Sequence, residues 1–75
     1  MKELTVYTKN GCVQCRMTER LLTQLHIPFT EHNLDQEPEY IDYLRDKGYQ
    51  ATPVIESKSF SFTGFRPDKL RQLAI

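Results

Sequence analysis

Cys12 and Cys15 are the residues of this chain whose type and spacing most clearly predict chemistry. Side chains at i and i+3 on one helical turn lie about 5–6 Å apart, within the window that a disulfide requires. A cysteine at a helix start also faces unpaired backbone N–H groups, which favour the thiolate that attacks disulfides. We therefore predict a redox-active pair in which Cys12 attacks a disulfide and Cys15 resolves the mixed disulfide that forms.

Alternating strands and helices are expected to hold this pair at a strand-to-helix junction. Apolar runs, turn residues and helical spacing predict strands at 4–7, 29–34, 54–56 and 60–62, and helices at 13–26, 38–48 and from 67 onward. The first β-α-β unit predicts a parallel crossover, and the last two strands, joined by a short turn, must be antiparallel. The order β-α-β-α-β-β-α predicts one α/β domain of residues 1–75, with a four-stranded mixed sheet flanked by three helices.

Helical spacing also predicts which side chains are buried. The residues expected in the core are Met17, Leu21, Leu22, Leu25, Tyr40, Ile41, Leu44, Leu70, Leu73 and Ala74. The helical residues expected in solvent are Arg16, Glu19, Arg20, Glu37, Glu39, Asp42 and Asp46. His26 and His32 are expected to be structural or solvent-exposed.

Size, charge and cysteine count exclude several classes of function. The chain has 75 residues, 39% of them hydrophobic, which suffices for one small core. Its net charge of zero argues against nucleic-acid binding, and it has no apolar run of the roughly 18 residues that a membrane span needs. Two cysteines offer half the ligands of a structural zinc site. We expect a cytoplasmic monomer without a targeting segment, metal or bound organic cofactor, in which the cysteine pair is catalytic.

Three further motifs, together with the cysteine pair, give the chain a family resemblance. They are Thr52-Pro53, the stretch 33–40 (Asn-Leu-Asp-Gln-Glu-Pro-Glu-Tyr) and the stretch 63–68 (Thr-Gly-Phe-Arg-Pro-Asp). In this arrangement the chain resembles the thioredoxin fold in its compact glutaredoxin form, and most closely the NrdH-redoxins. The resemblance covers essentially the whole chain, and although Cys-x-x-Cys alone is a weak motif, the combination is specific.

This resemblance implies a function, partners and a substrate platform. NrdH-redoxins are electron donors to the class Ib ribonucleotide reductase, and they are reduced by thioredoxin reductase with NADPH. The resemblance implies that the bond between Thr52 and Pro53 is cis. In the family, the backbone of the residue before this proline receives an extended substrate segment. The resemblance implies no cofactor beyond the Cys12–Cys15 disulfide.

Departures from the glutaredoxin pattern bear on the choice of reductant. Many glutaredoxins hold the glutathione tail with a Gly-Gly pair, whereas here Gly64 is followed by Phe65. A bulky ring should obstruct the close backbone approach that a second glycine permits. A glutathione-dependent glutaredoxin nevertheless remains an alternative. Alternatives of another class are an iron–sulfur cluster carrier that shares its site between two subunits and a regulatory adaptor.

Two interpretations remain open for several residues near these motifs. Lys9 and Arg16 could stabilise the Cys12 thiolate or lie in solvent. Phe65 is either a docking residue or part of the core. Arg66 either binds a partner or, with Asp68, orders its own loop. Asp68 could instead stabilise the start of the last helix, where a carboxylate is favoured.

Overall fold

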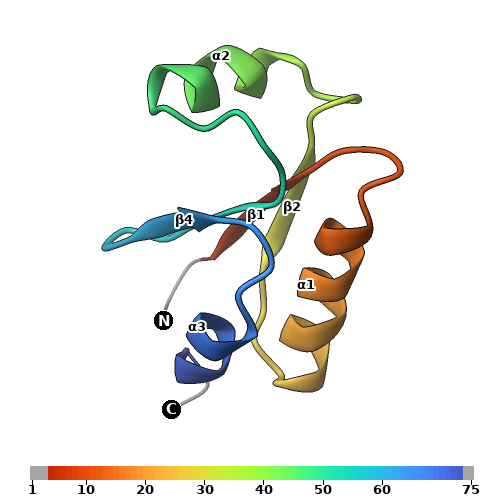
Figure 1. The fold of residues 1–75 in the computed structure, drawn as a ribbon, viewed down its shortest axis with the longest axis vertical. Helices are drawn as coiled ribbons and strands as arrows, with labels where there is room; N and C mark the ends of the chain where they lie inside the picture. The colour runs from red at the N-terminus through yellow and green to blue at the C-terminus, as the bar shows by residue number, and fades with distance from the viewer. Residues whose placement is uncertain (1–3, 74–75) are drawn as a thin grey trace.

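Four short strands form one mixed sheet, and three helices cover its two faces (Figure 1). The computed structural model describes residues 4–73 of the chain. The elements in chain order are β1 (Thr5–Thr8), α1 (Val13–Gln24), β2 (Thr30–Asn33), α2 (Glu39–Asp46), β3 (Val54–Glu56), β4 (Ser61–Thr63) and α3 (Pro67–Gln72). This order confirms the predicted fold class, with element ends that differ from the prediction by at most two residues.

The sheet has the strand order β2-β1-β3-β4, so β1 and β3 are its central strands. β1 pairs with β2 in parallel, as the crossover predicts, and β3 pairs antiparallel with both β1 and β4. Because successive strand side chains point to opposite faces, β1 contributes Val6 to one face of the sheet and Tyr7 to the other.

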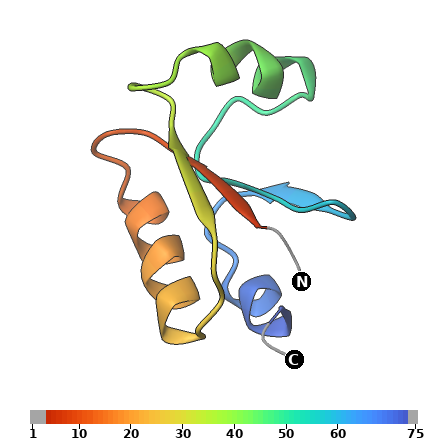
Figure 2. The ribbon, with the colours of Figure 1, turned by 180° about the vertical axis from the view of Figure 1, so that it is seen from behind.

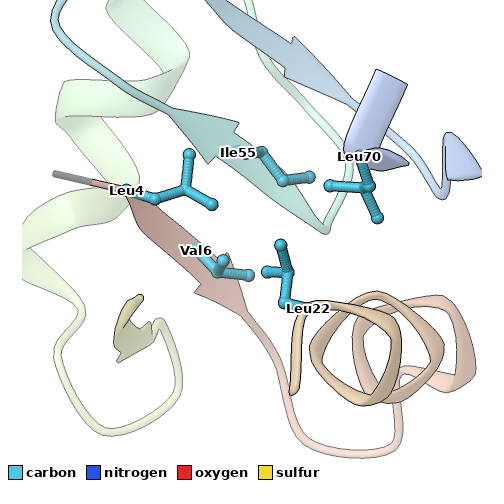
Figure 3. Packing of buried hydrophobic residues seen from close by; sticks show 5 residues of the cluster. All are labelled: Leu4, Val6, Leu22, Ile55 and Leu70. Atoms are coloured by element: carbon cyan, nitrogen blue, oxygen red, sulfur yellow. The ribbon is translucent and has the colours of Figure 1, made fainter. Parts of the chain in front are cut away.

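Each face of the sheet has its own hydrophobic core. α1 and α3 cover one face, where the buried cluster consists of Leu4, Val6, Leu22, Ile55 and Leu70 (Figure 3). α2 lies on the opposite face (Figure 2), where the buried cluster consists of Tyr7, Leu34, Leu44 and Val54. Within residues 4–73, no helix has both the length and the apolar character that crossing a membrane requires.

The buried stripe of α1 differs from the predicted one. Cys15, Thr18 and Leu22 face the sheet, whereas Met17 is 43% exposed. Leu21, Leu25 and, from α3, Leu73 pack partly against the core as expected; the prediction for Ala74 falls outside the described residues. The spacing of Met17, Leu21 and Leu25 fits a buried stripe. The neighbouring stripe of Cys15, Thr18 and Leu22 has the same helical spacing, and it is this stripe that the helix buries.

A charged side chain, Glu56, anchors α2 to the sheet. Its two carboxylate oxygens accept hydrogen bonds from Tyr7 (3.2 Å), Tyr43 (2.6 Å) and Lys47. Burial raises the pKa of Glu56, but the hydrogen bonds from Lys47 and Tyr43 outweigh it and lower that pKa overall. Burial and the Glu56 charge raise the pKa of Tyr7 and so favour the neutral phenol that donates this hydrogen bond.

His32 has structural surroundings and His26 is exposed, and each matches one of the two expectations for the histidines. His32 Nδ1 lies 3.1 Å from a Glu37 carboxylate oxygen, and its ring stacks on Tyr40 with centroids 4.4 Å apart. Glu37, expected in solvent, is thereby half-buried. His26 is exposed and adopts a left-handed backbone, with φ of 59°, just after α1. In the part of the chain that the structure describes, no three His, Cys, Asp or Glu side chains gather as a metal site would require.

Candidate active site

A disulfide joins Cys12 and Cys15 at the start of α1. Cys12 is the residue that caps the helix, and its Sγ accepts a hydrogen bond from the backbone N–H of Cys15 at 3.1 Å. The Cα atoms are 5.2 Å apart, and Cys15 is only 2% exposed whereas Cys12 is half-buried. These positions confirm that Cys12 lies at the helix start and Cys15 lies deeper. The N–H group and the helix dipole stabilise negative charge on Cys12 Sγ when the disulfide opens.

The loop before β3 places Thr52 against this sulfur. Thr52 Oγ1 donates a hydrogen bond to Cys12 Sγ over 3.5 Å, although 40 residues separate the two along the chain. The peptide bond from Thr52 to Pro53 is cis, as the family resemblance implied, and Pro53 is buried. The Thr52 hydroxyl therefore lies beside the sulfur of Cys12.

Thr63 and Gly64 hold this loop in place from the end of β4. Thr63 Oγ1 donates to the carbonyl oxygens of Ala51 (3.1 Å) and Pro53 (3.0 Å). The N–H of Gly64 also donates to the Pro53 carbonyl, at 2.9 Å. Gly64 has a φ of 89°, a left-handed conformation that glycine adopts without strain. Sequence reasoning missed the role of Thr63, because nothing local to 63 indicates that it reaches residues 51 and 53.

The residues after Gly64 lead into α3. Phe65 is half-buried and packs against the core cluster under α1 and α3. Arg66 is exposed, precedes the first helical residue of α3 and makes no ion pair within residues 4–73. Asp68 lies in the first turn of α3, where a carboxylate is favoured.

Neither of the basic residues beside the cysteine pair contacts the sulfur through its side chain. Lys9 and Arg16 are both exposed. Their connections to Cys12 run through the backbone: the Cys12 N–H donates to the Lys9 carbonyl at 3.4 Å, and the Arg16 N–H donates to the Cys12 carbonyl at 3.3 Å. Solvent-exposed charge is thus the interpretation that the geometry supports for both side chains.

A small apolar pocket lies next to Thr52 on the α2 side of the loop. Its volume is about 150 Å³, and its lining comprises Lys9, Leu34, Ile41, Leu44, Arg45, Tyr49, Gln50, Ala51 and Thr52. Ile41, predicted to be in the core, is 42% exposed, because it lies at this open rim rather than under the helix. The pocket offers room for about one side chain beside Thr52.

The hydrogen bond from Thr52 leads to a prediction about the reactivity of Cys12. Thr52→Val keeps the shape of the side chain but removes the donor, so we expect a less stable thiolate and a three- to tenfold slower attack, equivalent to roughly 1 kcal/mol. The pH dependence of Cys12 alkylation in the reduced protein measures this change. Thr23→Val is the matched control, since Thr23 is an exposed residue near the end of α1. A Thr52→Val protein with an unaltered alkylation profile would contradict the prediction.

Comparison with known proteins shows which proteins this chain is similar to. The glutaredoxin family model matches residues 4–59. The glutaredoxin-like protein NrdH of Lactococcus lactis subsp. cremoris is 44% identical over 71 residues, covering 95% of this chain and 99% of the relative. The NrdH of Escherichia coli K12 is 39% identical over 70 residues, covering 93% and 86% of the two chains. The solved structure of E. coli NrdH-redoxin superposes with a TM-score of 0.90 at 38% identity, covering 95% of this chain and 93% of that one.

Proposed function

Since the chain belongs to the glutaredoxin family and, within it, to the NrdH-redoxins, we propose that it donates electrons to a class Ib ribonucleotide reductase and is reduced by thioredoxin reductase with NADPH. The observation that carries this proposal is the Cys12–Cys15 disulfide at the start of α1, in a chain that matches NrdH over nearly its whole length. The E. coli NrdH-redoxin has a thioredoxin-like activity profile, which supports thioredoxin reductase as the reductant here.

The chemistry is thiol–disulfide exchange between two dithiols. In the reduced protein, the Cys12 thiolate attacks one sulfur of the partner disulfide and forms a mixed disulfide, while the other partner sulfur leaves as a thiolate. The Cys15 thiol then loses its proton and attacks Cys12 Sγ, which releases the second partner sulfur and leaves the Cys12–Cys15 disulfide. Two electrons have passed to the partner, and two electrons from NADPH restore the dithiol.

The decisive experiment compares two reducing systems on the same oxidised protein. One reaction supplies NADPH with thioredoxin reductase, and the other supplies NADPH, glutathione and glutathione reductase; reduction of the Cys12–Cys15 disulfide is followed in both. We expect thioredoxin reductase to be at least about tenfold faster, a difference of roughly 1.4 kcal/mol in the barrier. The reduced protein should then sustain turnover of a class Ib ribonucleotide reductase. Reduction by glutathione alone would favour the glutathione-dependent alternative.

The iron–sulfur carrier alternative predicts a visible property of the protein. A cluster held by cysteine thiolates absorbs visible light, so the purified protein would be coloured and would contain iron. We expect neither, because the two thiols cycle as a dithiol and a disulfide. Iron bound in stoichiometric amounts to protein purified without oxygen would overturn this expectation.

The ring of Phe65 leads to a prediction about glutathione. We propose that Phe65→Gly opens the backbone approach beside Gly64 and raises glutathione-dependent turnover by roughly tenfold, or about 1.4 kcal/mol. Phe65 also packs on the core, so the variant should lose about 1–2 kcal/mol of unfolding free energy. Phe60→Gly is the matched control, because Phe60 is another half-buried ring on the same cluster but lies at the far end of the β3–β4 hairpin. An equal change in glutathione turnover in both variants would assign Phe65 to packing alone.

A further inference from the structure

The outward face of α1 carries an unusual stripe directly beside the cysteine pair. Val13, Arg16, Met17 and Arg20 stand at i, i+3, i+4 and i+7, so they share one side of the helix. Val13 is 66% exposed and Met17 is 43% exposed. These two apolar side chains remain in water one residue and five residues after Cys12, although the same helix buries its other face against the sheet.

The stripe borders a hollow that is rimmed by positive charge. The hollow has a volume of about 480 Å³ and is lined by Val13, Arg16, Met17, Glu19 and Arg20. Arg16 and Arg20 are exposed, and neither forms an ion pair in the range 4–73. The Glu19 carboxyl balances them only in part, because Oε2 is buried, and burial and the charge of Glu31 on β2 raise its pKa to about 7.

Exposed arginines thus lie on the outward face of α1, although the net charge of the chain is zero. On α2, which lies across the sheet from α1 (Figure 1), Glu39 and Asp46 are exposed and Asp42 pairs with Arg45. The α1 side presents two unpaired arginines, and Lys9 adds a third exposed cation on the loop that leads to Cys12. A bound segment that reaches the sulfur of Cys12 along α1 would therefore meet apolar contacts flanked by cations.

We propose that the stripe of Val13, Arg16, Met17 and Arg20 is the docking surface for the partner protein, and that it takes a segment with an apolar side chain flanked by carboxylates beside the partner disulfide. Burial of Val13 and Met17 supplies the apolar contact. Arginine pairs with carboxylates through two parallel hydrogen bonds, which orients the segment and leaves its disulfide near Cys12. This inference rests on the proposed function only in that the substrate is a protein disulfide.

Two synthetic disulfide peptides test the docking surface without requiring the natural partner. Both carry a leucine beside a disulfide between two cysteines; one has aspartate flanks and the other has lysine flanks. We expect the reduced protein to turn over the aspartate peptide with a kcat/KM roughly tenfold higher, an advantage that added salt should diminish. The variant R16E/R20E should lose or reverse this ratio, and the ratio cancels any change in the intrinsic reactivity of Cys12.

A charge-matched variant separates local docking from overall charge. K58E/R71E changes the net charge by the same amount at two exposed positions outside the stripe, and it should keep the preference. Met17→Ser should lower kcat/KM for the aspartate peptide by about threefold, as expected for loss of an exposed apolar contact. Equal turnover of the two peptides by the parent protein, an intact preference in R16E/R20E, or its equal loss in K58E/R71E would overturn the proposal. The proposal would also be overturned if the parent chain formed a dimer that R16E/R20E dissociates.

The peptide ratio and the reductase comparison fail independently of each other. If the proposed function were wrong, thioredoxin reductase would not reduce the chain, but the preference between the two peptides would persist. If only the docking surface were wrong, the peptide preference would be absent while thioredoxin reductase still reduced the Cys12–Cys15 disulfide.

Discussion

Cys12→Ser is expected to abolish reduction of protein disulfides, lowering kcat/KM by at least about a thousandfold, because a neutral hydroxyl replaces the attacking thiolate. The Cys12 sulfur lies at the start of α1, with a backbone N–H and the Thr52 hydroxyl directed at it. Cys15 cannot substitute, since it is 2% exposed. The measurement is the rate at which thiols are released from a protein disulfide while the enzyme is kept reduced.

Cys15→Ser is expected to give a different defect, which identifies the order of the two steps. Cys12 remains able to attack, but no second thiol can release the partner, so a mixed disulfide accumulates and is visible on a non-reducing gel. Mass spectrometry of that species should place the linkage at Cys12. A Cys15→Ser protein that turns over protein disulfides at the parent rate would disprove the two-thiol mechanism.

Cys12→Ser also tests the possibility that the chain is a regulatory adaptor, which would use the fold without any thiol chemistry. An adaptor needs the surface of the protein but not its thiol chemistry. Cells that depend on this protein should therefore lose its function when Cys12 is replaced by serine. Full function in such cells would support the adaptor over the oxidoreductase.

The element order and the chemistry could be predicted from the sequence because both depend on local signals. The spacing of the cysteines, the apolar runs and the turn residues each act over a few positions, and the strands and helices lie within two residues of their predicted ends. The cis bond before Pro53 required the resemblance to a family, since a Thr-Pro sequence alone also permits a trans bond. Long-range contacts had no such signal. The hydrogen bonds from Thr63 to residues 51 and 53 depend on the pairing of β3 with β4.

The errors in burial on α1 share one physical cause. Helical spacing defines a stripe of side chains but not the angle at which that stripe meets the sheet. On α1 the sheet receives Thr18 and Leu22, so Met17 turns outward and Glu19 turns partly inward. Of the docking surface proposed above, Met17 is the residue whose exposure follows from this rotation. A predicted core residue, Met17, thereby becomes a candidate contact for the partner.

Glu19→Gln is expected to remove a pH dependence of stability that the parent protein shows around neutrality. Burial, the charge of Glu31 and a hydrogen bond to Glu31 raise the pKa of Glu19 from 4.5 to about 7. In the folded protein the protonated Glu19 carboxyl can donate to Glu31, whose Oε2 also accepts a 2.7 Å hydrogen bond from Thr8. Arg16 and Arg20 line the same hollow as Glu19, but neither pairs with it within residues 4–73.

The sign of the effect follows from the number of protons that each state binds. Between pH 4.5 and about pH 7 the folded protein keeps a proton on Glu19 that the unfolded chain releases, so the free energy of unfolding falls as the pH rises. A shift of this size corresponds to about 3 kcal/mol for a fully buried group. Glu19 is only half-buried, and screening by solvent reduces the expected loss to about 1–2 kcal/mol.

Urea unfolding of the parent and of Glu19→Gln, at about pH 5 and about pH 8, measures this loss. We expect the parent to lose about 1–2 kcal/mol more than the variant across this interval, so that Glu19→Gln is the more stable protein at the alkaline end. Glu39→Gln is the matched control, because Glu39 is exposed on α2 and should leave the pH profile of the parent unchanged. If Glu19→Gln lost as much stability as the parent, Glu19 would not hold its proton in the folded state. Its carboxylate would then face Arg16 and Arg20 as a charge, and the docking stripe would be less positive than we propose.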